Sequence, residues 1–173
     1  MPRTPRAITL RFLAEPSDVN FGGKVHGGAV MKWIDQAGFA CAAGWSGHYC
    51  VTVYVGGIRF LRPILIGHLV EVSARIVHTG RTSMHIAVEV RAGDLKEGGL
   101  SETTHCIMVF VAVSSTGGPV AVHTWHPENA EDEAMEKYAL NQMELRQAME
   151  SALNVPHRYE ARGGTSVKPA FRG

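Results

Sequence analysis

The order of apolar and polar positions divides the chain into one strand, one long apolar helix, four further strands and a terminal helix. Residues 7–13 alternate weakly between apolar and polar side chains, which predicts a short strand. From Ala29 to about Gly44 only three side chains are polar, so this segment predicts a helix whose apolar surface covers most of its circumference. Such a helix is expected to lie inside the fold and to be buried nearly all round.

Four β-rich runs follow this helix, with turn sequences between them. The runs cover residues 49–61, 69–78, 82–91 and 102–114. Because the connections are short, we expect consecutive strands to pair as antiparallel hairpins. Pro127 then opens a predicted helix that runs to about Leu153, and we expect the Gly- and Arg-rich tail after Pro156 to be mobile.

Few compact arrangements accommodate these elements. Apart from the C-terminal helix there is nothing else to bury the apolar helix, so the sheet must curl around it. This arrangement is the hotdog fold, of the α+β class. One copy leaves an open sheet edge and part of the helix uncovered, and we therefore expect dimers. The expected domains are a hotdog domain over residues 1–126, an acidic helix over 127–155 and a flexible basic tail over 156–173.

Composition and charge narrow the class of protein. The chain has 173 residues, of which 45% are hydrophobic, and this excludes a mainly disordered protein. The first 127 residues contain eleven basic and eight acidic side chains, whereas residues 128–153 contain two basic and seven acidic ones. Nucleic-acid binding needs a much denser basic face, so we expect no nucleic-acid partner. No apolar run approaches the roughly 20 residues that span a bilayer, so we expect no membrane partner.

Signals for targeting, disulfides and metals are weak. The apolar run behind the basic N-terminus is too short for a secretory signal, and we expect a cytoplasmic protein. Cys41, Cys50 and Cys106 are odd in number and form no CxxC pair, which indicates reduced, buried thiols. Among nine histidines only His123 and His126 are close in sequence, and no helical HExxH is present, so we expect no metal site.

Asp35 is the most informative single residue. Its neighbours on the helix are Met31, Gly38 and Phe39, so its carboxylate is expected to lie against apolar surface. Burial disfavours the charged form of a carboxylate, which suits a general base that works near neutral pH. The structural alternative is an ion pair with Lys32, three residues earlier on the same helix.

A glycine-rich loop over residues 19–28 leads into the helix. It ends in His26-Gly27-Gly28 at the helix N-terminus, where unpaired N–H groups stabilise a developing oxyanion, although glycines also serve loops that simply turn tightly. Gly27 and Asp35 are eight positions apart (35 − 27), or roughly 12 Å along a helix. A base and an oxyanion donor must each lie within about 3 Å of their reacting partners. A site at a dimer interface would resolve this conflict.

Asn20, in the same loop, has two interpretations. Its amide could orient a water molecule or donate to a carbonyl oxygen, or its side chain could form an Asx turn. Arg59, Arg62 and Arg81 lie near predicted strand ends and could bind phosphates, although isolated surface arginines usually have no such role.

Several motifs resemble those of the hotdog acyl-CoA thioesterases, a family that includes small bacterial acyl-CoA hydrolases and the mammalian cytosolic enzyme. The similar segments, in matching order and spacing, are residues 16–28, Met31, Trp33-Ile34-Asp35, Val51-Thr52-Val53, Phe60-Leu61-Arg62-Pro63 with Gly67, Gly80-Arg81-Thr82-Ser83-Met84 and Phe110-Val111-Ala112-Val113. The resemblance covers roughly residues 7–125 and leaves the acidic C-terminal helix outside.

The resemblance implies hydrolysis of acyl-CoA to a free carboxylic acid and coenzyme A. It implies that Asp35 is the base or nucleophile, that Asn20 faces it from the partner subunit, and that Gly27 and Gly28 are backbone oxyanion donors. The residues that match the family's coenzyme A and interface region are His26, Arg62, Arg81, Thr82 and Ser83. It implies no cofactor, since coenzyme A is part of the substrate, and it implies a homodimer that associates as a trimer of dimers.

Two other functions stay open at this point. A hotdog protein that binds acyl-CoA without cleaving it would keep the fold but would not need the carboxylate of Asp35. A hydratase on the same fold would normally pair an Asp with a nearby His, and His26 lies nine positions before Asp35. The mechanism is open as well, because Asp35 could deprotonate a water molecule or attack the thioester directly to form an anhydride.

Overall fold

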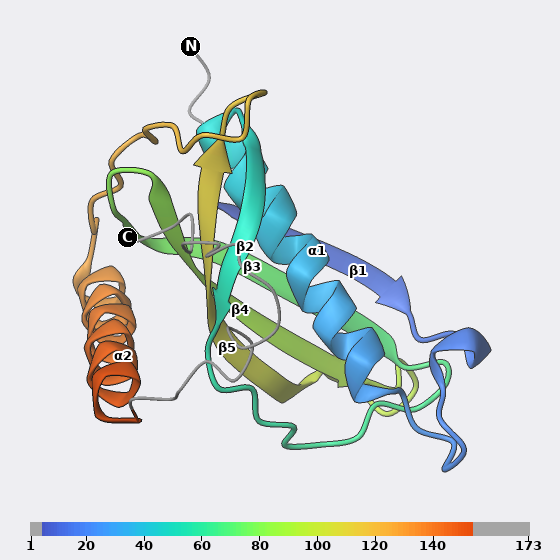
Figure 1. Ribbon diagram of the computed structural model, residues 1–173. Helices are drawn as coiled ribbons and strands as arrows, with labels where there is room; N and C mark the ends of the chain where they lie inside the picture. Colours follow the sequence, from blue (N-terminus) through green and yellow to red (C-terminus); the bar gives the residue numbers. More distant parts are fainter. Residues whose placement is uncertain (1–4, 154–173) are drawn as a thin grey trace, which may run out of the picture.

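One antiparallel sheet curls around a central helix in the computed structural model, which describes residues 5–153 (Figure 1). The elements in chain order are β1 (Ala7–Leu13), the short 3-10 helix η1 (Pro16–Asp18), α1 (Gly27–Ser46), β2 (Tyr49–Val55), β3 (Leu69–Thr79), β4 (Ser83–Gly93), β5 (Ser101–Val113) and α2 (Ala130–Leu153). This is the hotdog fold that the sequence predicts. The tail predicted over 156–173 lies outside the described residues. Within residues 5–153, no helix has the length and apolar character needed to cross a membrane.

The strand order in the sheet is β1-β3-β4-β5-β2, and all neighbouring strands are antiparallel. The β3–β4 and β4–β5 pairs are the expected hairpins. The expected hairpin between β2 and β3 is wrong, because β2 pairs with β5 at the sheet edge. Beyond β2 the chain continues beside β5, where the N–H of Leu61 donates to the carbonyl oxygen of Thr103 at 2.8 Å, and then crosses to β3.

The predicted strand over 49–61 is too long, and Gly56 explains where β2 stops. β2 ends at Val55, and the N–H of Gly56 donates to the carbonyl oxygen of Ile107 at 2.8 Å. A Cβ at position 56 would lie 2.9 Å from that same oxygen. The backbone therefore approaches β5 more closely here than a residue with a side chain would allow.

One face of α1 packs into the curve of the sheet. The buried residues of the helix include Val30, Trp33, Ile34, Ala37, Gly38, Cys41 and Ala42. The opposite strip of the helix is exposed in the single chain, with Met31 at 48% and Phe39 at 36% of full exposure. The expectation of a helix buried nearly all round is therefore wrong for one chain, because the curled sheet reaches only part of its circumference.

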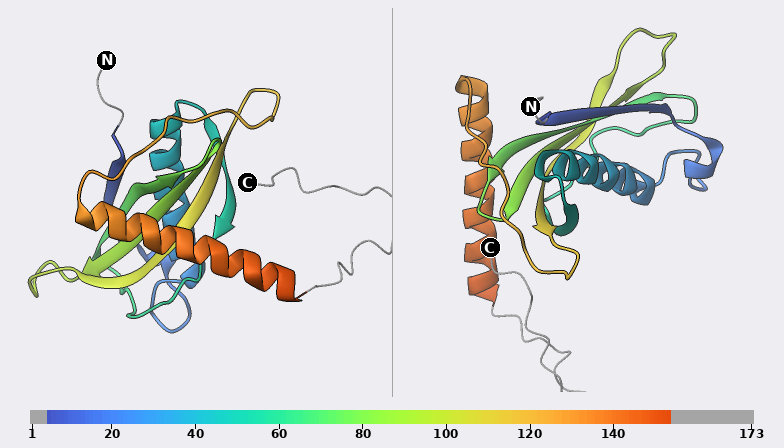
Figure 2. Two further views of the ribbon diagram at one scale, coloured as in Figure 1. Left: turned by 90° about the vertical axis from the view of Figure 1, so that its left-hand side faces the viewer. Right: turned by 90° about the horizontal axis from the view of Figure 1, so that it is seen from above.

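α2 covers part of the outer face of the sheet, the face opposite α1 (Figure 2). Val77 and Ile107 of the sheet form a small apolar cluster with Ala139 of α2. His85 is also buried, and its burial, with the neighbouring charges of His78 and Arg146, lowers its pKa to about 4. The imidazole therefore packs as a neutral ring at neutral pH.

Ion pairs fix the first half of α2 to the sheet. They join Arg6 to Asp132 at 2.7 Å and Arg75 to Glu131 at 2.8 Å, and a 2.8 Å hydrogen bond joins His78 to Glu136. The hydrogen bond from Arg6 lowers the pKa of the buried Asp132 carboxyl group. The helix is thus attached near β1 and β3 through Glu131, Asp132 and Glu136 of its first two turns.

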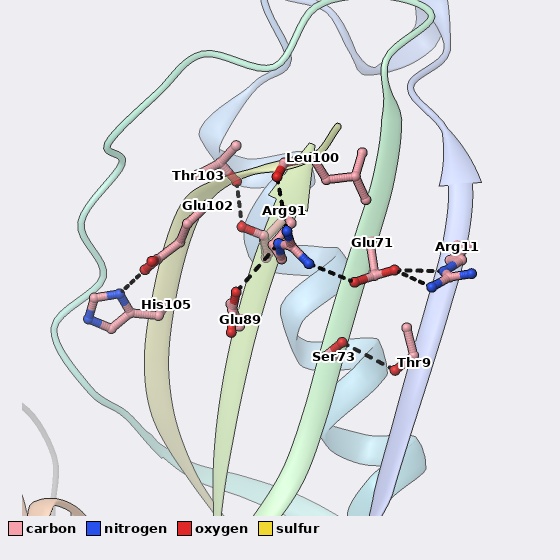
Figure 3. A network of polar contacts seen from close by, with 11 residues as sticks. Thr9, Arg11, Glu71, Ser73, Glu89, Arg91, Leu100, Glu102, Thr103 and His105 are labelled. Atoms are coloured by element: carbon pink, nitrogen blue, oxygen red, sulfur yellow. Dashed lines mark hydrogen bonds and ion pairs between the residues drawn. The ribbon is translucent and has the colours of Figure 1, made fainter. Parts of the chain in front are cut away.

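A polar network occupies the part of the outer face that α2 leaves uncovered (Figure 3). Glu71 is 8% exposed and binds two nitrogens of Arg11 at 2.6 and 2.7 Å. Arg91 lies 3.8 Å from the other oxygen of Glu71 and 3.8 Å from Glu89. The hydroxyl groups of Thr9 and Ser73 lie 3.2 Å apart beside this network. Because these charged and hydroxyl groups make this part of the outer face polar, it does not need to be covered by a helix.

The three cysteines are free and buried, which confirms the expectation from the sequence. Burial raises the pKa of Cys41 to about 12 and that of Cys106 to about 11. It also raises the pKa of Cys50. These thiols are protonated at neutral pH and are therefore poor nucleophiles.

Gly38 sets how closely α1 approaches the sheet, and its replacement tests this packing. A Cβ at Gly38 would lie 2.7 Å from the ring of the fully buried Phe110. We expect Gly38→Ala to destabilise the protein by about 1–3 kcal/mol through overpacking. Gly44 lies in the same helix with no atom within 4 Å of its virtual Cβ, so Gly44→Ala should be neutral or stabilise by about 0.5–1 kcal/mol. Denaturant unfolding at one protein concentration measures the change in stability for both variants. Equal effects of the two substitutions would contradict the close approach of α1 to Phe110 at Gly38.

Candidate active site

Asp35 lies on the exposed strip of α1 and contacts β2. Its Oδ1 accepts a 2.6 Å hydrogen bond from the hydroxyl group of Thr52. Among residues 5–153 no ion pair joins Asp35 to Lys32. The purely structural interpretation of Asp35, as the partner of Lys32, is therefore wrong. A hydroxyl donor orients a carboxylate without neutralising its charge. The Thr52 hydroxyl therefore fixes the orientation of the Asp35 carboxyl group.

The sequence interpretation did not assign Thr52 to the site. The signal lay in the topology: α1 ends at Ser46, and β2 begins at Tyr49 after a turn at Gly47, whose φ of 70° is left-handed. A strand that returns at once beside a helix places some of its side chains against that helix. Thr52 is the β2 residue whose hydroxyl reaches Asp35.

Apolar side chains near Asp35 stay exposed in the single chain. They are Met31 and Phe39 on α1 and Tyr49, Val53 and Val55 on β2, with Tyr49 at 65% of full exposure. The Phe39 and Tyr49 rings lie 5.7 Å apart. β2 is an edge strand, and its outer edge pairs with no strand among residues 5–153. An apolar edge strand of this kind is a surface that another chain can cover.

Asn20 organises the loop that precedes α1. Its side-chain oxygen accepts hydrogen bonds from the backbone N–H groups of Gly22 at 2.9 Å and Lys24 at 3.3 Å. The Asx turn is therefore present. Because the oxygen is engaged inside the loop, the side-chain NH₂ is the group left to donate outward. The Asx turn is compatible with a donor role for the side-chain NH₂ of Asn20, because the turn uses only the side-chain oxygen.

α1 begins two residues earlier than the sequence predicts. Its first residue is Gly27, and His26 is the N-cap residue, with an exposed side chain that makes no capping hydrogen bond. The first N–H groups of a helix have no acceptor within that helix. Those of Gly27 and Gly28 are thus donors at the positive end of the helix dipole. The earlier start places both glycines in the first helical turn.

A cavity of about 330 Å³ brings Asn20, Gly27 and Arg62 together. Its wall includes the buried Val30 and the half-exposed ring of Phe60. Phe60 lies against Gly27, since a Cβ at Gly27 would be 3.4 Å from the ring. The cavity thus joins an apolar wall, a cationic side chain and the donor groups at the start of α1.

The other predicted site residues lie elsewhere in the single chain. Arg81, Thr82 and Ser83 lie at the β3–β4 turn, at the end of the sheet opposite the Asn20 loop (Figure 1). α1 separates these ends with 20 residues, about 30 Å of helix. Asp35 lies between them, about 12 Å along the helix from Gly27. One chain therefore holds the predicted residues in three separate groups.

Comparison with known proteins gives consistent matches. The thioesterase superfamily pattern matches residues 22–98. The acyl-CoA thioester hydrolase YciA of Salmonella typhimurium is 36% identical over 123 residues, which are 69% of this chain and 92% of that protein.

Two solved structures are similar over most of the chain. An apo-hexameric acyl-CoA thioesterase is 28% identical with a TM-score of 0.80, over 86% of this chain and 95% of that one. An Asn-to-Ala variant of the acyl-CoA hydrolase from Staphylococcus aureus, in complex with coenzyme A, is 23% identical with a TM-score of 0.83, over 93% and 96% of the two chains. The second likeness shows a shared fold.

Proposed function

This chain belongs to the hotdog-fold acyl-CoA thioesterases and is a thioester hydrolase; on that premise we propose that it cleaves acyl-CoA to a free carboxylic acid and coenzyme A at a site shared by two chains. The observation that carries the proposal is the bond from Thr52 to Asp35 on an exposed apolar surface. This carboxylate is about 12 Å along α1 from the N–H groups of Gly27 and Gly28. The Asp35 carboxylate and the N–H groups of Gly27 and Gly28 in one chain are therefore too far apart to act on the same thioester, and each supplies half of a site.

Pairing of two chains through β2 supplies the missing half. Two chains related by a two-fold axis at this edge would carry their α1 helices antiparallel. The start of one helix, with Asn20, Gly27 and Gly28, would then face Asp35 of the partner subunit. The exposed strip of α1 and the unpaired edge of β2 support this arrangement. One solved relative is hexameric, and we propose that this chain likewise assembles as a trimer of such dimers.

The proposed reaction uses Asp35 as a general base. Asp35 takes a proton from a water molecule while the water oxygen attacks the carbonyl carbon of the thioester. The N–H groups of Gly27 and Gly28 and the amide of Asn20 hold the charge that develops on the carbonyl oxygen. The carbon–sulfur bond then breaks, and the coenzyme A thiolate takes the proton from Asp35. In the second possible route Asp35 attacks the carbon itself, and a single turnover in heavy-oxygen water would then label its carboxylate.

The spacing of three polar residues supports these roles. Alanine variants of an Asn, an Asp and a Thr of the Staphylococcus aureus acyl-CoA hydrolase have been solved. In that protein the Asn precedes the Asp by 15 positions (43 − 28), and the Thr follows the Asp by 17 (60 − 43). Asn20, Asp35 and Thr52 have the same spacings here, 15 (35 − 20) and 17 (52 − 35).

We propose that the coenzyme A moiety lies along the interface between the two chains. With antiparallel α1 helices, the β3–β4 turn of one chain lies at the same end as the Asn20 loop of the other. Arg81, Thr82 and Ser83 of one chain would then join His26 and Arg62 of the other. Arginine side chains bind phosphate groups with paired charged hydrogen bonds, which suits the phosphates of coenzyme A.

The contacts of Asp35 disfavour the two other functions. A protein that only binds acyl-CoA has no need for a carboxylate oriented by Thr52. A hydratase would pair Asp35 with a histidine, and the similarity of this chain to acyl-CoA thioester hydrolases disfavours that function. Among residues 5–153 no histidine makes a hydrogen bond to Asp35.

Replacement of Asp35 tests the proposed reaction. We expect Asp35→Asn to lower kcat/KM by about 10²–10⁴-fold on every accepted acyl-CoA, because the amide cannot take a proton. Release of free thiol from acyl-CoAs of increasing chain length measures this, and Glu97→Gln in the exposed β4–β5 turn is the control. A folded Asp35→Asn enzyme with more than a tenth of the activity would contradict the role. A wild-type protein that binds acyl-CoA tightly without turnover would favour the binding function.

Two variants of Asn20 separate its two roles. Asn20→Asp keeps an oxygen that can accept from Gly22 and Lys24 but has no N–H donor, whereas Asn20→Ala loses both. If the amide stabilises the oxyanion, both variants should lose about 10²–10³-fold in kcat. Steady-state kinetics measures the losses. An Asn20→Asp enzyme with nearly full activity would show instead that Asn20 only shapes the loop.

A further inference from the structure

The second half of α2 has an apolar stripe with nothing packed over it among the described residues. Leu145, Met149 and Leu153 are 61–65% exposed, and they are four positions apart, so they share one face of the helix. All residues from 147 to 153 are exposed. The first half of the helix, in contrast, is attached to the sheet by two ion pairs and a hydrogen bond. A short helical segment without packing is marginal in water, so this stripe needs a partner surface.

The direction of α2 shows where that surface must be. Figure 2 shows α2 crossing the outer face of the sheet and continuing past β2. Arg146 still lies over the ring of Tyr54 on β2, at 4.5 Å from the ring centroid. The residues after Arg146 therefore lie at or beyond the edge strand. In the proposed dimer this is where the sheet of the second chain begins.

The stripe also forms one wall of a groove. This groove has a volume of about 1160 Å³, and Leu145, Met149 and Leu153 line it together with Tyr54, Arg59 and His105. A two-fold axis at β2 would place the α2 end of the second chain in this groove and the α2 end of the first chain in the groove of the second. The same surface is then buried on both sides, as a symmetric dimer interface requires.

The charged side chains at the groove also suit the α2 end of a second chain. Arg59 lines the groove and makes no ion pair within the described range. The exposed end of α2 carries Glu144 and Glu150, and Glu150 has only a 3.7 Å contact with Arg146 of its own helix. Arg146 and Glu150 of the same chain also line the groove, so Arg59 and Arg146 together exceed its one carboxylate. A second α2 would therefore bring apolar side chains and acidic groups to a groove with an apolar wall and an excess of positive charge.

We infer that α2 is a clamp between the two chains of the dimer, in which Leu145, Met149 and Leu153 of each chain occupy the groove of the other. The inference rests on the proposed function, because it requires the dimer that pairs through β2. The clamp holds the two subunits together on the side of the sheet opposite the site. It thereby maintains the contact between Asp35 of one chain and the Asn20 loop of the other.

Charge substitution in the stripe tests the clamp in the full-length chain. Leu145→Glu/Met149→Glu places two charges in the stripe, and Gln147→Glu/Ser151→Glu places the same two charges on the opposite side of the same helix. Sedimentation velocity over a range of concentrations measures the dimer dissociation constant. We expect an increase on the order of 30-fold or more for the stripe variant, with activity lost on dilution, and no change for the control.

Three results would overturn the inference. One is a stripe variant that associates like the control, which would mean that the stripe has another cover, such as the residues after Leu153. Another is a stripe variant that falls from hexamers to stable, active dimers, which would place the stripe between dimers. A wild-type chain that is monomeric at all concentrations would overturn the proposed dimer together with the clamp.

Cysteine cross-linking gives a readout that does not depend on weakened association. The three native thiols are buried, so an introduced cysteine is the reactive one. We expect mild oxidation to give covalent dimers for at least one of Leu145→Cys, Met149→Cys and Leu153→Cys, because symmetric helices meet at equivalent positions. Gln147→Cys, on the opposite side, should stay uncross-linked. No cross-link at any of the stripe positions would contradict the clamp.

Discussion

The rise of a straight helix is the constraint on which the proposed site depends. α1 carries backbone donors at Gly27 and Gly28 and a carboxylate at Asp35, and eight positions of helix separate them by about 12 Å. α1 is one continuous helix over Gly27–Ser46, so the two groups of one chain stay this far apart. A second, antiparallel copy is the simplest way to bring them within reach of one carbonyl group. The exposed strip of α1 and the unpaired edge of β2 then have a common explanation.

Each half of the site is prepared within its own chain. The Thr52 hydroxyl holds one oxygen of Asp35, and the Asx turn engages the oxygen of Asn20 so that its NH₂ is free to donate. Donors that are fixed before the charge develops stabilise a transition state without the cost of reorientation. The proposed dimer would therefore have to align two preformed halves, and α2 on the outer face would provide a second contact surface for that alignment.

The fold was predictable because local patterns were strong: an apolar helix, β-rich runs and turn sequences between β3, β4 and β5. The partner of β2 was not, because Gly56 stops the strand through contact with Ile107, which is distant in sequence. In the site, Asp35 and the glycines at the start of α1 had local signals in helix spacing and backbone type. Thr52 did not, because its role depends on how β2 lies against α1. An uncovered part of α1 was expected for one copy of the fold, but its residues were not, because the apolar pattern is the same whether its own sheet or a second chain covers a position.

Complementation between two inactive variants tests the shared site most directly. Asp35→Asn and Asn20→Ala each remove one half, so neither homodimer contains a complete site. When the two proteins are mixed in equal amounts and allowed to exchange subunits, half of the dimers are mixed, and each mixed dimer has one complete site of two. The account predicts that the mixture recovers about a quarter of the wild-type thioesterase activity. A mixture that exchanges subunits, as shown by the mass of the mixed dimer, but recovers no activity would contradict a site built from two chains.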